Sequence, residues 1–167
     1  GVLSSSLAID KELSKKIFIK NKIITPSYIK FIFKKNLDKK KIIKKVKNKL
    51  NFPVVIKPIN EGSSVNVYIC YESNFFKNLS KLKNYDEILI EKFIPGREIQ
   101  VAILGKKKLG VIELKPKRKF YDYEAKYNPK AKTKHIIPVN ISNNEYKKVT
   151  SLALKAHNLL KCRGVTR

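Results

Sequence analysis

Methionine and tryptophan are absent from this 167-residue chain. A chain that begins at Gly1 without methionine has either lost its initiator residue or been cut from a longer protein. Its other end, Cys162 to Arg167, has no polar tail and stops where a new strand begins. We therefore expect the chain to be an internal fragment of a longer protein.

Cysteine is almost as scarce, since Cys70 and Cys162 are the only two. Two cysteines are too few for a disulfide framework, and their spacing does not match that of metal ligands. Because a free cysteine packs as a small hydrophobic residue, we expect both to be buried structural thiols.

Long hydrophobic runs are also missing. No stretch approaches the roughly 20 apolar residues that span a bilayer, and residues 1–8 are too short for a signal peptide. With 43% hydrophobic residues the chain can still bury a core, which excludes global disorder. These features predict a cytoplasmic protein without a membrane partner.

Acidic residues are few: 13 Asp and Glu against 38 Lys and Arg give a net charge of +25. Such a charge suggests nucleic-acid binding. Only four of the basic residues are arginine, whereas base-reading proteins favour arginine because its planar fork pairs with guanine. The lysines are spread along the chain beside many isoleucines and asparagines, which is typical of an AT-rich genome.

The densest lysine run, Lys39 to Lys49, does not change that interpretation. Ile42, Ile43, Val46 and Leu50 recur through it at helical spacing. Apolar residues at this spacing form one face of an amphipathic helix. The run therefore predicts a helix with a solvated lysine face.

The order of helices and strands predicts an α+β fold. Periodicity and breakers predict helices at 11–21, 37–50, 74–83 and 143–160, and strands at 28–33, 53–58, 65–71, 88–93, 98–104 and 109–114. The inner faces of the first and last helices are expected to carry Leu13, Ile17 and Phe18, and Val149, Leu152, Ala156 and Leu159. Two lobes, 1–90 and 91–167, are expected to meet near Glu91.

The segment from Lys57 to Ser64 places a lysine at a strand end, followed by a turn with one glycine and two hydroxyls. Phosphate groups need this combination, because backbone N–H groups and hydroxyls bind the oxygens while a cation offsets their charge. A simple hairpin turn with an exposed lysine is the alternative interpretation.

A second set of residues surrounds a Pro-Gly turn. Glu91, Lys92, Phe93 and Ile94 precede the turn, and Glu98 follows it. A strand edge of this kind can present backbone groups to adenine while a carboxylate accepts from ribose hydroxyls. The alternative is a surface ion pair between Glu98 and a nearby lysine or arginine.

The third set is the octet Phe120 to Tyr127, which packs four aromatics, two acids and a lysine behind a strand-like run. Rings mixed with opposite charges suit neither a core nor a flexible linker. Long ordered loops are usually functional. The octet therefore predicts a structured loop that lies over a ligand.

In order and spacing, these sets resemble the D-alanine–D-alanine ligases of the ATP-grasp superfamily. The combination of E-G-S-S with Y-D-Y-E-A-K-Y is highly specific, and the resemblance covers the entire chain. It implies an ATP-grasp fold, with a central ATP-binding lobe and part of the C-terminal lobe.

The resemblance also implies a role for each matching residue. The ATP phosphates are contacted by Lys11, Lys57, Lys126, Glu61, Gly62, Ser63 and Ser64. Adenine and ribose are contacted by Glu91, Lys92, Phe93, Ile94, Glu98 and Phe120. The catalytic residues are Ser63, Tyr127 and Arg167. Ser63 and Tyr127 close the site around substrate, and Arg167 stabilises charge on a tetrahedral intermediate.

Two parts of the family pattern are expected outside this sequence. The resemblance places the domain that holds the first substrate before Gly1 and the Mg²⁺ ligands after Arg167, so no metal ligand is assigned within the chain. His135 and His157 match no catalytic position and are expected to be structural or surface residues.

The implied activity is the ATP-dependent ligation of two D-alanines through an acyl phosphate, for peptidoglycan synthesis. The intact enzyme is expected to be a homodimer that binds no nucleic acid, and the isolated chain is expected to be inactive. A D-alanine–D-lactate ligase is an alternative, although Tyr127 argues against it because lactate-using relatives carry a different residue there. The other two alternatives are a lysine-rich nucleic-acid-binding module and a non-catalytic remnant.

Overall fold

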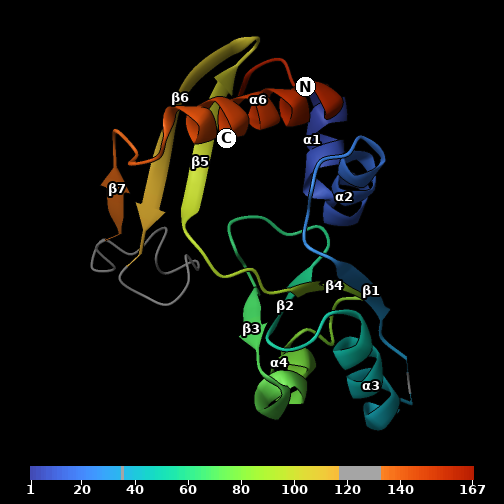
Figure 1. Ribbon diagram of the computed structural model, residues 1–167. Coiled ribbons are helices and arrows are strands. Elements are labelled where there is room, and N and C mark those ends of the chain that lie inside the picture. Colours follow the sequence, from blue (N-terminus) through green and yellow to red (C-terminus); the bar gives the residue numbers. More distant parts are fainter. Residues whose placement is uncertain (35, 117–132) are drawn as a thin grey trace. The chain divides into compact units, whose positions relative to one another are not determined.

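The computed structural model describes residues 1–34, 36–116 and 133–167. The chain forms two compact units (Figure 1): unit 1 contains residues 1–24 and 96–167, and unit 2 contains residues 25–95. The lobes predicted from the sequence, 1–90 and 91–167, do not coincide with these units. The difference arises because the first helices pack with the last helix of the chain, not with the strands that directly follow them.

Unit 2 is an antiparallel sheet with helices on one face (Figure 1). Its elements are β1 (Tyr28–Ile32), α3 (Lys39–Lys49), β2 (Val54–Pro58), β3 (Tyr68–Cys70), a 3₁₀ turn (Glu72–Asn74), α4 (Phe75–Lys81) and β4 (Glu87–Lys92). The strand order is β1-β4-β2-β3, so the last strand of the unit inserts between two earlier ones.

One apolar core holds unit 2 together. Residues of α3, α4 and their C-caps share it with all four strands of the unit: Val46, Leu50, Phe75, Leu79, Leu82, Ile29, Val54, Ile56, Cys70, Ile88 and Ile90. The lysine-rich segment forms the predicted amphipathic helix, because Asp38 caps it through a bond from the Lys41 N–H (3.0 Å) and Val46 faces the core. The predicted burial of Cys70 is confirmed.

Unit 1 is built around a second antiparallel sheet. Its elements are α1 (Val2–Ile9), α2 (Lys11–Lys20), β5 (Glu98–Leu104), β6 (Lys107–Lys115), β7 (Lys134–Ile136), α6 (Asn143–Leu159) and β8 (Val165–Thr166). The strand order is β7-β6-β5-β8, and α6 packs across β5 and β6 (Figure 1). The α1–α2 pair joins this unit through α6, where the Lys155 ammonium donates to the Asn21 carbonyl (2.6 Å).

The predicted inner faces of two helices are partly wrong. Leu13 and Leu152 are 40% and 46% exposed, whereas Thr150 and His157 are buried on α6. At about 100° per residue, Leu152 lies some 200° around the helix from Thr150. The two buried residues of α6 are thus polar, and the expected Val149, Ala156 and Leu159 are partly buried. Cys162 is only partly buried. Within the described residues, no helix combines the length and hydrophobicity needed to cross a membrane.

Candidate active site

The end of β2 carries the first element of the site. Lys57 lies one residue before the strand ends, and its ammonium contacts the Glu91 carboxylate at 2.5 Å. Antiparallel pairing of β2 with β4 sets Val55 opposite Glu91. Lys57 is two residues beyond Val55, so its side chain lies on the same face of the sheet as those of Val55 and Glu91. The side chains are 20% and 8% exposed, so this is a largely buried ion pair. It joins two residues that the sequence placed in separate sets.

The predicted phosphate loop follows directly. Ser63 and Ser64 adopt left-handed backbone conformations (φ 49° and 61°), as does Asn66 (φ 54°). Backbone N–H groups of turns that include left-handed residues can point together into an anion-binding concavity. Gly62 and Ser63 are exposed, so a ligand can reach this turn. The arrangement is more elaborate than a plain hairpin turn and favours the phosphate-binding interpretation.

Two residues that the sequence did not single out fix this loop. The Tyr85 hydroxyl donates to Glu61 Oε1 (3.1 Å) and accepts from Asn66 Nδ2 (2.8 Å). Tyr85 is 24 residues from Glu61 in sequence. No spacing rule connects such distant positions, so only the fold reveals the contact.

The predicted adenine segment leaves β4 at Lys92. The N–H groups of Lys92 and Phe93 donate to the carbonyls of Ser27 (2.9 Å) and Pro53 (3.2 Å), which fixes the segment to unit 2. Over the described ranges, the Ile94 N–H has no hydrogen-bond partner, and the Ile94 side chain is 57% exposed. This segment therefore offers a backbone donor beside an apolar side chain, a combination that suits a purine ring.

Glu98 begins β5 in unit 1. It accepts a long bond from Gln100 Nε2 (3.4 Å) and forms no ion pair with any described residue, so the ion-pair alternative is wrong for Glu98 itself. Its neighbour Arg97 instead pairs with Glu113 through two bonds (2.9 and 2.6 Å) and donates to the Asn140 carbonyl (3.0 Å). The bond from Arg97 lowers the pKa of Glu113 below its ordinary value.

Lys11 and Arg167 also belong to unit 1. Lys11 is the first residue of α2. Asp10 caps the N-terminus of this helix, because its carboxylate accepts a hydrogen bond from the Leu13 N–H (2.8 Å). Arg167 follows β8, which pairs with the end of β5. The other predicted site residues, Phe120, Lys126 and Tyr127, lie outside the described residues.

A hydrogen bond anchors β8 beside Arg167. His157 on α6 and Thr166 on β8 are joined by a 2.7 Å bond between Nδ1 and Oγ1. His157 is 3% exposed, which gives it the structural role expected from the sequence. The contact fixes the backbone directly before Arg167.

Metal ligands do not gather within the described residues, where no three His, Cys, Asp or Glu side chains come together. The chemistry of the residues described here involves charge neutralisation by lysine and arginine side chains and hydrogen bonding by backbone groups.

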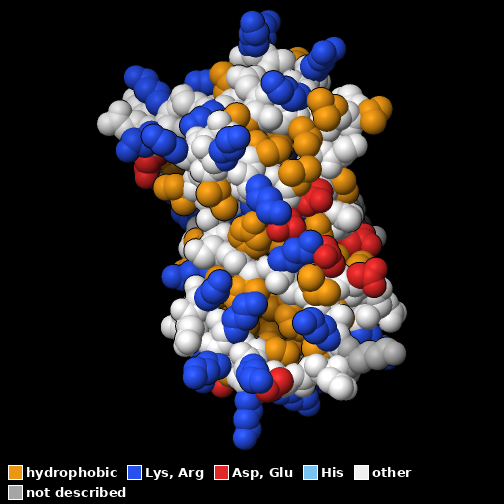
Figure 2. All heavy atoms as spheres, turned by 90° about the vertical axis from the view of Figure 1, so that its right-hand side faces the viewer, with side chains coloured by type: hydrophobic (Ala, Val, Ile, Leu, Met, Phe, Trp, Pro, Cys, Tyr) orange, Lys and Arg blue, Asp and Glu red, His pale blue; other side chains and the backbone are white. Residues whose placement is uncertain are grey.

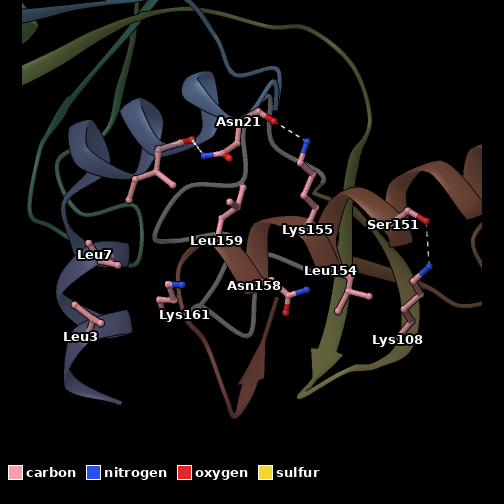
Figure 3. A pocket seen from close by; sticks show the side chains of 11 residues that line it. Leu3, Leu7, Asn21, Lys108, Ser151, Leu154, Lys155, Asn158, Leu159 and Lys161 are labelled. Carbon is pink, nitrogen blue, oxygen red and sulfur yellow. Dashed lines mark hydrogen bonds between the residues drawn. The ribbon is translucent and has the colours of Figure 1, made fainter.

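A groove of about 710 Å³ lies apart from these residues in unit 1 (Figure 3). Leucines from α1 and α6 line it, and Lys108 and Lys155 at its edge already bond Ser151 (3.0 Å) and Asn21. None of the predicted site residues lines this groove. On the face in Figure 2, lysine and arginine side chains are scattered among apolar and uncharged ones and form no continuous stripe.

Antiparallel sheets in two units, with a phosphate-type loop joining two strands of one of them, define an ATP-grasp fold. The family model for the D-Ala-D-Ala ligase C-terminus matches residues 17–167. The chain belongs to this family.

Individual relatives agree with the family match. A D-alanine–D-alanine ligase of Pelagibacter ubique is 66% identical over the whole chain, which covers 54% of that protein. The solved D-alanine–D-alanine ligase of Bacillus anthracis is 33% identical with a TM-score of 0.78, covering 98% of this chain and 52% of that one. A structure of the Bacillus anthracis ligase complexed with ATP is 26% identical with a TM-score of 0.73, covering 98% and 50%. The chain thus spans about half the length of the relatives it matches.

Proposed function

We propose that this chain supplies the ATP site and part of the catalytic machinery of a D-alanine–D-alanine ligase. The observation that carries the proposal is the junction of β2 with the loop after it. There a largely buried, ion-paired Lys57 lies beside the left-handed residues Ser63 and Ser64. The Bacillus anthracis ligase was solved in complex with ATP, which supports ATP as the ligand proposed for this junction.

The chemistry explains why these residue types are needed. A carboxylate is a poor electrophile, so the γ-phosphoryl group of ATP is first transferred to the carboxylate of one D-alanine, giving an acyl phosphate and ADP. The amine of a second D-alanine attacks the carbonyl carbon, and the tetrahedral intermediate collapses with loss of phosphate and a proton. Both steps concentrate negative charge, which fixed cations and oriented donors stabilise.

Each described residue has one task in this scheme. Lys57 neutralises phosphate charge, and Ser63 orients the substrate. The Ile94 N–H donates to adenine, and the Glu98 carboxylate accepts from ribose. Lys11 contacts phosphate, and Arg167 stabilises the charged intermediate. Lys92 and Phe93 flank the adenine donor as part of the same segment.

The octet residues complete the proposal. Phe120 would lie against adenine, Lys126 would meet phosphate, and Tyr127 would join Ser63 around the substrate. In an extended segment adjacent side chains point to opposite sides, so Lys126 and Tyr127 can serve different ligands. Tyr127→Phe should then impair D-alanine use and leave nucleotide affinity nearly unchanged, whereas Lys126→Ala should impair phosphoryl transfer.

The remaining features of the intact enzyme are proposals of the same kind. It would use magnesium, with ligands placed by the resemblance after Arg167, and would act as a cytoplasmic homodimer in peptidoglycan synthesis. The isolated chain would show no turnover, because it spans about half of its relatives and its described residues gather no metal ligands.

The test is a chimaera in which this chain replaces the matching part of the Pelagibacter ubique ligase, to which it is 66% identical. Phosphate release from ATP that depends on D-alanine is expected from the chimaera, and none from the chain alone. Release with D-lactate in place of the second D-alanine would favour the lactate alternative. Binding of DNA or RNA that weakens with salt, without any ATP-dependent activity, would favour the nucleic-acid alternative.

A further inference from the structure

The loop between β2 and β3 has a backbone that its sequence does not favour. Ser63, Ser64 and Asn66 are left-handed (φ 49°, 61° and 54°). Gly62, the one residue that adopts such angles without steric cost, is not among them. Non-glycine residues persist in this region only where the surroundings over-determine them. Some neighbouring group must therefore hold the loop in shape.

The hydroxyl of Tyr85 is one such group, beside the backbone bond from the Val65 N–H to the Gly62 carbonyl (2.9 Å). It donates to Glu61 Oε1 (3.1 Å) and accepts from Asn66 Nδ2 (2.8 Å). A phenol has one proton to give and can accept at the same time, so a single hydroxyl bonds the first and last residues of the 61–66 segment. Both serines lie between these two bonds.

Asn66 is held from a second side. The Tyr68 hydroxyl donates to Asn66 Oδ1 (3.2 Å), so the amide gives its proton to one tyrosine and accepts from another. Asparagine also tolerates the left-handed conformation better than most residues. Asn66 thus meets the backbone requirement and adds a side-chain link that glycine would lack.

The two tyrosines are themselves fixed. Both rings are partly buried against the apolar core of unit 2. Tyr68 belongs to β3, and the Tyr85 N–H bonds the Leu82 carbonyl (3.0 Å) in the turn before β4. The loop is therefore tied through side chains to the most rigid part of its unit.

We propose that Tyr85 and Asn66 are positioning residues that hold the 61–66 loop in its phosphate-binding shape before nucleotide arrives. This inference rests on the proposed function, because it assigns phosphate to that loop. If only part of the population has the competent loop, apparent affinity falls by that fraction. The two residues would thus raise affinity for phosphate without touching it.

The test uses two variants and a matched control in this chain. Tyr85→Phe removes both hydroxyl bonds and keeps the ring, and Asn66→Gly keeps the left-handed backbone and removes the amide link. Tyr146→Phe is the control, since the Tyr146 hydroxyl on α6 bonds none of the described residues. Amide hydrogen exchange without nucleotide should speed up at residues 62–67 in both variants, while α3 and the control keep the wild-type rates. Unchanged exchange at 62–67 would overturn the proposal.

Nucleotide titrations separate a positioning role from general destabilisation. Dissociation constants for ATP should rise roughly tenfold in both variants, as expected for the loss of one or two side-chain hydrogen bonds. The constant for adenosine, which lacks phosphate, should not change. Equal weakening for adenosine and ATP, or faster exchange with unaltered ATP affinity, would contradict the proposal. A wild-type chain that binds no ATP would refute the proposed function instead, and the exchange data would still decide whether Tyr85 and Asn66 hold the loop.

Discussion

The two units are stabilised in different ways. Among the described residues, the twelve largest fully buried side chains include eleven from unit 2 and only Ile103 from unit 1. Unit 1 buries six polar or charged residues beside the apolar Ile23, Ile103, Val111 and Leu114: Ser4, Ser14, Lys15, Glu113, Thr150 and His157. Because burial of apolar surface is the main driving force of folding, unit 2 is held by its core, and unit 1 depends more on polar contacts.

This difference matches the position of the site residues. The 61–66 loop and Lys57 lie on the unit with the dense apolar core. Glu98 and Arg167 lie in unit 1, next to polar anchors: the Arg97–Glu113 pair and the His157–Thr166 bond. Sites built on rigid elements are more precise than sites on loosely packed ones. Unit 2 thus suits phosphate binding, which needs a fixed arrangement of donors.

The largest expected effect is on the core of unit 2. Phe75 is fully buried and packs edge-to-face on Phe52 and Phe76, with ring centroids 5.7 and 5.2 Å away. Phe75→Ala should lower the free energy of unfolding by about 3–5 kcal/mol, measured by urea denaturation. Leu152→Ala on α6 is the control and should change it by less than about 0.5 kcal/mol, because Leu152 is 46% exposed. A loss of several kcal/mol from Leu152→Ala would show that apolar packing holds unit 1 as well.

The next effect is on ATP binding. In the active chimaera, Lys57→Ala should weaken ATP binding roughly tenfold to hundredfold, because a charged hydrogen-bond partner typically contributes about 1.5–3 kcal/mol. Lys44→Ala and Lys45→Ala change exposed lysines on α3 and should have little effect. Circular dichroism must confirm that each variant is folded, since Lys57→Ala leaves Glu91 buried without its cation. Equal weakening by all three substitutions would point to a diffuse polyanion-binding surface.

Local signals in the sequence predicted most of the fold. Asp10, Asp38 and Ser142 cap α2, α3 and α6 as side-chain acceptors. Strands β1 to β6 lie near their expected positions, whereas β7 was not predicted. The first helix, α1, was not expected, because its sequence is short, uncharged and rich in serine. It gains its stability from packing on α2 and from the bond between Ser14 Oγ and the Leu7 carbonyl (2.7 Å). Such tertiary support is not encoded in local periodicity.

The sequence predicted which residues belong to the candidate site, but not the ion pairs and hydrogen bonds that join them. The motif around Lys57 predicted a phosphate site, and the resemblance assigned Glu91 to a separate, adenine-contacting set. Their ion pair exists because β4 inserts between β1 and β2, a topological choice that no local pattern specifies. The Tyr85 bonds likewise need the folded sheet before they become visible.

Acid should act on unit 1 through two carboxyl groups. In unit 2 the exposed α3 cap Asp38 also has a lowered pKa, through the bond from the Lys41 N–H, but it lies outside β4. The hydrogen bond from Arg97 lowers the pKa of Glu113. Hydrogen bonds from the side chain and the backbone N–H of Ser142, the residue that caps α6, lower the pKa of Glu145. A carboxyl with a depressed pKa stabilises the fold above its unfolded pKa, about 4.3, and that contribution is lost as pH falls through the folded pKa. Backbone resonances of α6 should therefore lose their native positions at a higher pH than those of the core-facing residues of β4.

The matched variants for this acid effect are two glutamine substitutions. Glu113→Gln should reduce stability at neutral pH and flatten the acid dependence, because the group no longer titrates. Glu72→Gln removes a half-exposed ion pair with Lys47, which is worth little, and should leave the pH profile unaltered. If β4 lost its native resonances at a higher pH than α6 in the wild-type chain, the predicted order of acid sensitivity would be wrong.

The smallest expected effect separates the two thiols. Cys70 is fully buried in unit 2, where desolvation raises its pKa and Asn78 Nδ2 lies 3.5 Å from its sulfur. Cys162 follows α6 in unit 1 and is partly exposed. With Ellman's reagent near pH 8, Cys162 should react first, and Cys70 roughly a hundredfold more slowly, because buried groups wait for the structure to open. Cys162→Ser should abolish the fast phase, and Phe75→Ala should accelerate the slow one by loosening the core around Cys70. Equal rates for both thiols in the wild-type chain would mean that the core of unit 2 opens as readily as the turn after α6, and the contrast between the units would then fail at its most direct test.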